Sequence, residues 1–459
     1  MSSCPASPLD VIILAAGKGK RMHSDIPKVL HKVGGRSLLA HVVDTALSLD
    51  ASAVHVVVGH EAEQIRFAFE TAPVTWSLQA EQLGTGHAVA QAMPNVSDDA
   101  LVLVLYGDVP LIQAGTLRQL LAQAGNRALA VLTLNSTNPH GLGRILRDAE
   151  GRAIAIVEEK DATAEQKAIK ETNSGIMAVH SATLRQWLGR LNNDNAQGEY
   201  YLTDIVGLAV ADGIAVETLR IDDELEVLGV NNKSQLAQLE RHYQRRMAQQ
   251  LLDAGVTLAD PDRIDVRGKL LCGRDVEIDI NCIFEGKVEL GNRVSIGPNV
   301  CIKNAVISDN SVIHANSHID GAQVAENCAI GPFARLRPGT VMNNGSKIGN
   351  FVETKKATLG AGSKVNHLSY VGDATLGREV NIGAGTITCN YDGVNKFETR
   401  IEDNVFVGSN TALVAPVKIG ENATIGAGST ITRDVPGDHL AIARGRQRTI
   451  EGWKKPTRK

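Results

Sequence analysis

The sequence predicts two domains of different fold class: an α/β domain with a mostly parallel sheet, followed by a parallel β-helix. Three observations predict this arrangement. Strand-like and helix-like segments alternate up to about Asn232, aliphatic residues then recur at every sixth position, and only 3% of the residues are aromatic. A chain of 459 residues also exceeds what one hydrophobic core usually supports. We therefore expect domains over residues 1–231 and 253–459, joined by a linker helix over residues 232–252.

The amino-terminal segments alternate in a way that is typical of a Rossmann-like sheet. Short β-branched or Leu-rich runs end in small or turn residues, and helical patterns lie between them. The runs are DVIILAAG, AVHVVVGH, ALVLVLYGD and ALAVLTL, and the helical patterns include SLLAHVVDTALSL and GTGHAVAQAM. This order favours a mostly parallel sheet covered on both faces. Ligands of such sheets bind beyond the carboxyl ends of the strands, where Gly17, Gly59 and Asp108 fall.

Residues 232–252 have the pattern of a helix with one apolar face. The residues on that face are Leu236, Leu239, Tyr243, Met247 and Leu251, with Gln, Arg and Glu between them. This spacing is close to the helical period, so we expect one continuous helix between the domains.

Beyond this helix the hydrophobic period becomes six residues, which indicates a parallel β-helix with a small aliphatic residue of each hexad pointing into a narrow interior. The first series breaks only at His318, and its members are Val288, Val294, Val300, Val306, Val312, Val324, Ile330, Leu336, Met342 and Ile348. A second series consists of Val405, Thr411, Val417, Ala423 and Ser429, partnered by Val407, Leu413, Ile419, Ile425 and Ile431. Low aromatic content agrees with this prediction, because bulky rings do not stack in so thin a core.

Composition argues against several classes of protein. The net charge of −4 disfavours nucleic acid as a partner, so we interpret the basic end RGRQRTIEGWKKPTRK as a solvated terminus that can also contact an anionic ligand. Six scattered cysteines, Cys4, Cys272, Cys282, Cys301, Cys328 and Cys389, form no CxxC pair and are expected to be reduced. No signal peptide and no apolar run of about 18 residues is present. We expect a cytoplasmic protein without membrane insertion.

The loop LAAGKGKRMHSDIPKVLH directly follows the apolar run Val11–Ile13 and is strongly basic. It matches neither the Walker A pattern nor the GxGxxG fingerprint. Gly17 and Gly19 would let backbone N–H groups approach a phosphate, while Arg21 and Lys28 supply fixed positive charge. Asp108 ends the run ALVLVLYG, where it could be a Mg²⁺ ligand or simply a turn residue. The residues alone leave both alternatives open.

The loop resembles the signature of sugar-nucleotide pyrophosphorylases, and motifs along the whole chain extend the match. They are QLGTGHA (82–88), YGDVPL (106–111), GLGRI (141–145), IVEEKDA (156–162), TNSGI (172–176) and GVNN (229–232), then ARLRPG, GNFVETKKA, VNHLSYVGDA and NIGAGTITCNYDG. Together they resemble the family of bacterial bifunctional N-acetylglucosamine-1-phosphate uridyltransferases and glucosamine-1-phosphate acetyltransferases. The resemblance implies a left-handed β-helix, and two reactions that make UDP-N-acetylglucosamine for peptidoglycan and lipopolysaccharide.

For the amino-terminal domain the resemblance implies uridylyl transfer from UTP to a sugar phosphate, with Mg²⁺ held by Asp108 and Asn231. Arg21 and Lys28 take the catalytic positions. The nucleotide and sugar positions are Leu14, Ala15, Ala16, Gly17, Lys28, Gln79, Gly84, Thr85, Tyr106, Gly107, Asp108, Gly143, Glu158, Asn173 and Asn231. The choice of Glu158 over the adjacent Glu159 depends on the alignment of IVE. Lys20 stands where the family usually has Thr, and it is left out of the catalytic set.

For the β-helix the resemblance implies acetyl transfer from acetyl-CoA to glucosamine-1-phosphate, with His367 as the base. A lone histidine is usually only a satisfied polar residue, but a base with a pKa near neutrality is what this reaction requires. The sugar-phosphate positions are Arg337, Lys355, Tyr370 and Asn381, and the acetyl-CoA positions are Ala384, Asn390, Tyr391, Ser409, Ala427 and Arg444. Asn390 is also a candidate to orient the imidazole.

The resemblance further implies a homotrimer that assembles through the β-helix and takes small-molecule substrates. Two other hypotheses stay open on the sequence. In one the β-helix only oligomerises or regulates a single enzyme, and in the other the chain is a non-catalytic scaffold. The polar segments VNHLSYVGDA and NYDGVNKFETR disfavour the first, and the basic loop with Asp108 disfavours the second.

Overall fold

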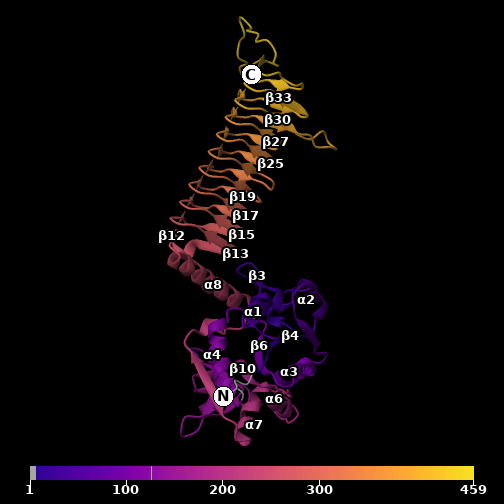
Figure 1. The fold of residues 1–459 in the computed structure, drawn as a ribbon, viewed down its shortest axis with the longest axis vertical. Helices are drawn as coiled ribbons and strands as arrows, with labels where there is room; N and C mark the ends of the chain where they lie inside the picture. The colour runs from indigo at the N-terminus through magenta and orange to yellow at the C-terminus, as the bar shows by residue number, and fades with distance from the viewer. Residues whose placement is uncertain (1–6, 126, 459) are drawn as a thin grey trace, which may run out of the picture. The chain divides into compact units, whose positions relative to one another are not determined.

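The computed structural model describes residues 7–125 and 127–458, which form two compact units, Met1–Tyr243 and Gln244–Lys459 (Figure 1). The boundary between them falls inside the long helix α8 (Lys233–Asp253), whose apolar face contains the buried Leu239 and Leu251. Within these described residues, no helix combines the length and the apolar character that crossing a membrane requires. Five cysteines carry free thiols, and Cys4 lies outside the described residues.

The amino-terminal unit is built on one twisted sheet of mostly parallel strands. Its strand order is β11-β7-β10-β6-β1-β4-β5, in which only β10 runs antiparallel to its neighbours, while β8 and β9 extend the sheet beside β10. The strands are β1 (Leu9–Leu14), β4 (Ala53–Val58), β5 (Thr75–Leu78), β6 (Leu101–Tyr106), β7 (Leu129–Asn135), β8 (Arg144–Arg147), β9 (Ala153–Val157), β10 (Glu171–His180) and β11 (Val216–Ile221). The four runs read from the sequence as strands are β1, β4, β6 and β7, so that prediction is confirmed.

Helices cover both faces of this sheet, because the central strands are apolar on both sides. Along β1, Val11 and Ile13 belong to one core cluster, while Ile12 and Leu14 belong to another. The helices are α1 (Leu38–Leu47), α2 (Ala62–Ala68), α3 (Thr85–Ala92), α4 (Ala114–Ala124), α5 (Ala164–Lys167), α6 (Ser181–Leu188) and α7 (Ile205–Ala211). Short 3-10 turns and a small hairpin complete the unit: η1 (Lys20–Met22), η2 (Lys28–Leu30), η3 (Met93–Asn95), η4 (Leu202–Asp204), η5 (Glu224–Glu226), β2 (Lys32–Val33) and β3 (Arg36–Ser37).

The carboxy-terminal unit is a parallel β-helix in which each strand pairs in parallel with the equivalent strand of the next coil. Its strands form two long stacks, and η6 (Pro261–Arg263) precedes the first long strand. One stack comprises β12 (Thr257–Leu258), β14 (Glu277–Ile278), β16 (Ser295–Ile296), β18 (Val312–Ile313), β21 (Ala329–Ile330), β24 (Lys347–Asn350), β26 (Lys364–His367), β28 (Asn381–Ile382), β31 (Phe406–Val407), β34 (Thr424–Ile425) and β36 (Leu440–Ala441). The predicted β-helix of hexapeptide repeats is thus confirmed.

The second stack holds the longer strands of the coils. It comprises β13 (Ile264–Cys272), β15 (Cys282–Leu290), β17 (Cys301–Ile307), β19 (His318–Asp320), β20 (Gln323–Val324), β22 (Arg335–Leu336), β23 (Val341–Met342), β25 (Glu353–Leu359), β27 (Tyr370–Leu376), β29 (Ile387–Cys389), β30 (Thr399–Ile401), β32 (Ala412–Val414), β33 (Val417–Ile419) and β35 (Thr430–Ile431). Several of these strands run along two adjacent sides of a coil.

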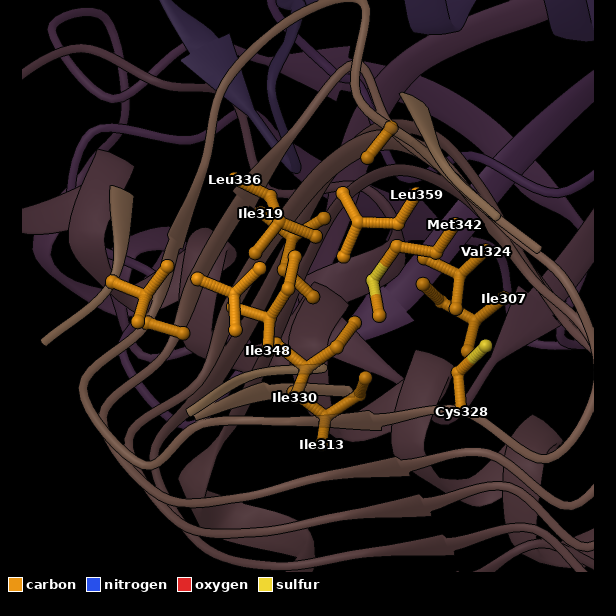
Figure 2. Close-up of a cluster of buried hydrophobic side chains, with 14 of the residues drawn as sticks. Ile307, Ile313, Ile319, Val324, Cys328, Ile330, Leu336, Met342, Ile348 and Leu359 are labelled. Atoms are coloured by element: carbon orange, nitrogen blue, oxygen red, sulfur yellow. The ribbon is translucent and has the colours of Figure 1, made fainter. Parts of the chain in front are cut away.

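The interior of the β-helix corrects one part of the sequence prediction. Val306 is 42% exposed and Val312 only half-buried, so neither fills the interior, whereas Ile307, Ile313 and Ile319 are fully buried. The register between β15 and β17 shifts after Glu285, which shortens that coil by one residue and moves the frame. The apparent misfit at His318 is therefore a frame shift, because Ile319 occupies the interior position. Figure 2 shows these isoleucines packed with Ile330, Leu336, Met342 and Ile348.

Candidate active sites

A cavity of about 230 Å³ lies at the carboxyl edge of the amino-terminal sheet. It forms because β1 ends at Leu14 between two parallel neighbours, β4 and β6, and the chain then leaves the sheet as the basic loop. Predicted residues that line it are Leu14, Ala15, Ala16, Gly17, Lys28, Gln79, Gly84, Thr85, Tyr106 and Asp108. The sequence analysis missed four further lining residues, Val29, Gln82, Ala88 and Glu199. Predicted Gly107 lies beside this cavity, where its N–H donates to the Leu14 carbonyl.

Lys28 is held at this cavity by its own loop. Gly19 has a φ of +56°, and a Cβ there would lie 2.8 Å from the Cβ of Lys28, so only glycine lets the two segments pack this closely. Pro27 precedes the turn η2, which begins at Lys28. The sequence thus folds the loop back so that the Lys28 ammonium faces the end of β6.

The Lys28 ammonium lies between the two residues that the sequence predicts as metal ligands. It forms an ion pair with the Asp108 carboxylate and lies 3.4 Å from Oδ1 of Asn231. The Asp108 carboxylate after β6 and the Asn231 amide oxygen before α8 therefore converge on one positive charge. Carboxylate and amide oxygens are the ligands that Mg²⁺ prefers. Among the described residues, no group of three or more His, Cys, Asp or Glu side chains is arranged so that it could hold a metal ion. A divalent cation here would complete its shell with water and phosphate oxygens.

Arg21 is a predicted catalytic residue that the structure does not bring to the cavity. It lies on η1, is exposed, and does not line the cavity. Within residues 7–125 and 127–458, its guanidinium has no hydrogen-bond or ion-pair partner. An uncommitted, exposed cation on a glycine-bearing loop is free to turn toward an anion that enters the cavity.

Three predicted sugar positions form a second group beside Tyr106. The N–H of Asn173 donates to the Gly143 carbonyl (2.9 Å), and the Glu158 carboxylate accepts from the Thr203 hydroxyl (3.0 Å). Burial raises the pKa of Glu158, and neighbouring carboxylates raise it further. Burial likewise raises the pKa of Tyr106, and the charges of Glu158 and Asp108 raise it further.

The structure distinguishes the two adjacent glutamates. Glu159 forms an ion pair of 2.6 Å with the buried Arg144, which lowers the pKa of its carboxyl. Glu158 instead faces Gly143, where a Cβ would lie 3.4 Å from its Oε1. Glu159 is therefore committed to the fold, and Glu158 is the one placed with the sugar positions.

Helix α8 holds the segment that follows Lys28, a feature that sequence reasoning missed. The N–H of Gly34 donates to Oε2 of Glu240 (2.8 Å), and Nζ of Lys233 lies 3.3 Å from Nδ1 of His31. Gly34 has a φ of +55°, and a side chain there would overlap the Tyr243 ring. The first half of α8 thus fixes the turn between Lys28 and α1. A Gly-Gly turn before a helix was visible in the sequence, but its partner was not.

In the β-helix, the predicted base His367 lies at the end of β26. Its neighbour is Asn350, at the equivalent position of β24 one coil earlier, and Nδ1 of His367 lies 2.7 Å from Oδ1 of Asn350. The amide oxygen accepts the Nδ1 proton, which leaves Nε2 as the basic nitrogen. The imidazole partner is thus Asn350 and not Asn390, which corrects the sequence expectation.

Three of the predicted sugar-phosphate positions, Arg337, Lys355 and Tyr370, lie on strands of the neighbouring stack or directly after one, and the two cations have acidic partners. Arg337 forms an ion pair of 3.0 Å with Glu353, and Lys355 lies 3.7 Å from Asp373, which also accepts from the Asn390 amide. Tyr370 and Glu353 occupy the same register position on adjacent coils, and the Tyr370 hydroxyl lies against Gly372.

Further side chains near this group extend it along the coils. The sequence analysis missed Lys396. The neighbouring ammonium group of Lys355 lowers the pKa of Lys396. Asn381 is half-buried in β28 and aligns with Lys364, while Tyr391 is exposed and its hydroxyl donates to the Gly393 carbonyl. Cations thus outnumber their acidic partners on this part of the surface.

The predicted acetyl-CoA positions Ala384, Ser409 and Ala427 follow one another along a single corner of the stacked coils. The N–H of Asn410 donates to the Ala384 carbonyl, and the N–H of Gly428 donates to the Ser409 carbonyl. Nη1 of Arg444 donates to the Ala427 carbonyl (2.6 Å). The same corner begins at His367, whose carbonyl accepts from the N–H of Gly385 (3.4 Å). A ligand lying along this corner would reach from Arg444 to the imidazole.

Comparison with known families matches three parts of the chain. Residues 11–199 match the MobA-like NTP transferase domain, residues 266–347 match the GMPPB C-terminal domain, and residues 398–433 match the bacterial transferase hexapeptide (six repeats). The first match covers the cavity at the sheet edge. The others lie in the β-helix.

Several relatives match this chain over nearly its whole length and over nearly the whole of theirs. The bifunctional protein GlmU of Marinobacter nauticus is 61% identical over 450 residues, which cover 98% of this chain and 99% of that protein. The proteins of the same name from Cellvibrio japonicus and Saccharophagus degradans are each 58% identical over 451 residues, covering 98% of this chain and 100% of theirs.

Proposed function

The chain belongs to the bifunctional GlmU family, and we propose which part of it and which residues perform each of its two activities. It is a bifunctional transferase that makes UDP-N-acetylglucosamine, a precursor of peptidoglycan and lipopolysaccharide. We assign uridylyl transfer to residues 1–231 and acetyl transfer to residues 253–459, with residues 232–252 as the linker helix. The observation that carries this assignment is that each part holds its own cluster of reactive groups, at the sheet edge and along the β-helix.

In uridylyl transfer, a phosphate oxygen of N-acetylglucosamine-1-phosphate attacks the α-phosphorus of UTP, and the bond to the departing pyrophosphate breaks. The attacking phosphate is already ionised, so the protein must mainly position two anions and neutralise their charge. Lys28 at the cavity and the uncommitted Arg21 supply that charge. Asp108 and Asn231 would hold Mg²⁺, whose chemistry is to bind and neutralise phosphate oxygens.

The other residues of this cavity position the substrates. Leu14–Gly17, Gln79, Gly84 and Thr85 line the cavity and would surround the nucleotide, with Gly107 hydrogen-bonded to Leu14 beside them. Gly143, Glu158, Asn173 and Tyr106 would contact the sugar, where a buried carboxylate can accept from a hydroxyl group. Tyr106 lines the same cavity as Asp108, and the charge of Glu158 helps to raise its pKa, which supports a sugar phosphate that bridges the two groups.

In acetyl transfer, Nε2 of His367 removes a proton from the amine of glucosamine-1-phosphate as the nitrogen attacks the thioester carbon. The carbon–sulfur bond breaks and the thiol of coenzyme A leaves. Asn350 holds the imidazole in the tautomer that this step needs. Arg337, Lys355, Tyr370 and Asn381 would bind the sugar phosphate, and Ala384, Asn390, Tyr391, Ser409, Ala427 and Arg444 the acetyl-CoA.

We propose that three copies assemble through the β-helix. Phe333, Phe351 and Leu368 occupy one corner of three successive coils and are 49%, 55% and 62% exposed. The same corner carries Asn or Gly on the other coils, such as Asn299, Asn316 and Gly385. The rings of Phe333 and Phe351 are stacked at 5.2 Å, and Leu368 directly follows His367 in the chain. A neighbouring copy would cover this apolar corner. Sedimentation equilibrium should give a trimer, and a monomer would contradict the assembly.

Both donors, UTP and acetyl-CoA, are metabolites of the cytoplasm, and we place the enzyme there. The activity is tested by mass spectrometry after supplying glucosamine-1-phosphate, acetyl-CoA, UTP and Mg²⁺ together and then with each omitted. Omission of UTP should leave N-acetylglucosamine-1-phosphate, and omission of acetyl-CoA should leave the amino sugar unchanged. Omission of Mg²⁺ should stop only the second reaction. An acetylated product absent under every condition would restrict the β-helix to an oligomerising role.

A further inference from the structure

Gln79 presents only one end of its amide group to the nucleotide cavity. The residue follows β5, is 3% exposed and lines the cavity. Its Nε2 donates to the Gly84 carbonyl (3.1 Å) and lies 3.1 Å from Nδ1 of His87 on α3. Its Oε1 has no hydrogen-bond partner within the described part of the chain. The amino group is therefore held away from the ligand, and the carbonyl oxygen remains available to it.

The contacts of Gln79 determine the tautomer of His87. A carbonyl oxygen can only accept, so the Gly84 contact fixes which end of the Gln79 amide is the amino group. Nδ1 of His87 faces that same amino group and must accept from it. The ring proton of the neutral imidazole then lies on Nε2, which is 3.2 Å from the side-chain amide of Gln91. The Gln91 amino group also lies 3.5 Å from the His87 carbonyl, a contact too long to hold it, and the tautomer set by Gln79 favours the orientation in which the Gln91 oxygen accepts from Nε2.

We propose that His87 is a positioning residue that makes the cavity selective for uracil over cytosine. The proposal rests on the uridylyl transfer proposed above. Uracil has an N–H group at N3, which can donate to Oε1 of Gln79, whereas cytosine has a lone pair at N3 that this oxygen repels. Without an acceptor at the Nδ1 position, the Gly84 carbonyl alone holds the amino group of Gln79, so turning that group toward cytosine costs one hydrogen bond instead of two. The discrimination between the two bases therefore depends on a side chain behind the residue that contacts them.

The test compares kcat/KM for UTP and CTP in the full-length enzyme and two variants. His87→Ala removes the acceptor, and the UTP/CTP ratio should fall by about tenfold, with the value for UTP falling and that for CTP rising. His87→Asn puts Oδ1 in the place of Nδ1, so the ratio should stay within about threefold of the original. A merely structural role would lower both values together and leave the ratio unchanged.

Other results are equally decisive. An unchanged ratio in His87→Ala, or a His87→Asn enzyme as unselective as His87→Ala, would overturn the proposal. Should His87→Ala not fold, His87→Gln fills the space without an acceptor at the Nδ1 position and should lose the same selectivity. If the unmodified enzyme releases no pyrophosphate from UTP and the sugar phosphate, it is the proposed uridylyl transfer that fails.

Discussion

The two units assemble their candidate sites in opposite ways. In the α/β unit, Lys28, Asp108 and Asn231 are brought together from distant parts of the chain by the crossovers of a parallel sheet. In the β-helix, His367 contacts Asn350 only 17 residues earlier, because the next coil places equivalent residues side by side. One site depends on topology and the other on repetition. A repeat thus joins residues that are close in the sequence, whereas a sheet site requires the whole unit to be folded.

The largest effect is expected from a substitution in the α/β unit, whose site depends on sheet topology. Asp108→Ala removes a proposed Mg²⁺ ligand and the ion-pair partner of Lys28, so uridylyl transfer should fall by about a thousandfold. Acetyl transfer in the same preparation is the internal control and should be nearly unchanged. Pyrophosphate release and thiol release measure the two reactions. A folded variant that loses both activities would contradict the separation of the two sites.

The next largest effect is expected from a substitution in the β-helix, whose site depends on the stacking of equivalent coils. His367→Ala removes the proposed base, and acetyl transfer should fall by several hundredfold, on the order of what general bases contribute. Uridylyl transfer should stay near its original rate. His318→Ala is the matched control, since it removes an exposed histidine from another coil of the same β-helix. Equal losses in the two variants would mean that His367 has no special role.

A smaller effect is expected from Asn350, the residue of the preceding coil that positions His367. Asn350→Ala leaves His367 in place but removes the acceptor that fixes its tautomer, so kcat for acetyl transfer should fall by about tenfold. The KM values for both substrates should change little, because Asn350 is not placed against either of them. Asn343→Ala removes a different amide contact between coils, to the Leu359 carbonyl, and serves as the control. An increase in KM without a loss of kcat would contradict a positioning role.

The smallest effect concerns charge in the α/β unit. Burial raises the pKa of Glu158, so its ionised form destabilises the folded state, and that cost grows as pH rises from the ordinary carboxyl range through the raised pKa. Glu158→Gln should therefore raise the melting temperature of this unit by about 2 °C at pH 8 and have no effect at acidic pH.

Glu159 provides the matched control with the opposite sign. Arg144 lowers the pKa of its carboxyl, so the ionised form stabilises the fold above the ordinary carboxyl range, and this stability is lost as pH falls through the lowered pKa. Glu159→Gln should lower the melting temperature at pH 8, and the difference should vanish in acid. Calorimetry across this range measures both variants, and shifts of the same sign would contradict the assignment of the two carboxyls.

Most of the fold follows from the sequence because its patterns are long and local. The runs that became β1, β4, β6 and β7 are continuous apolar segments, and the six-residue period persists through both series of the β-helix. Ala305, and not Val306, takes the interior position equivalent to Val288, and this was not predictable, because a five-residue side looks the same as a six-residue side until the coils are stacked.

The sequence was less informative about residues that act through others. Asn350 could have been found by counting one coil back from His367, but the coil length at that point was not known from the sequence. Glu240 and Tyr243 carry no motif, and their contacts with Gly34 depend on where α8 packs within its unit. Loop motifs thus predicted the lining of the cavity, while tertiary packing decided what supports it.

Two separate sites are proposed to act in sequence, with N-acetylglucosamine-1-phosphate released between them. Mixing two variants tests this most directly. Asp108→Ala and His367→Ala are each supplied with glucosamine-1-phosphate, acetyl-CoA, UTP and Mg²⁺, alone and together. Neither variant alone should form UDP-N-acetylglucosamine, and the mixture should form it, because one acetylates the sugar and the other couples it to UMP. No nucleotide sugar from the mixture, with each single activity still measurable, would contradict the account.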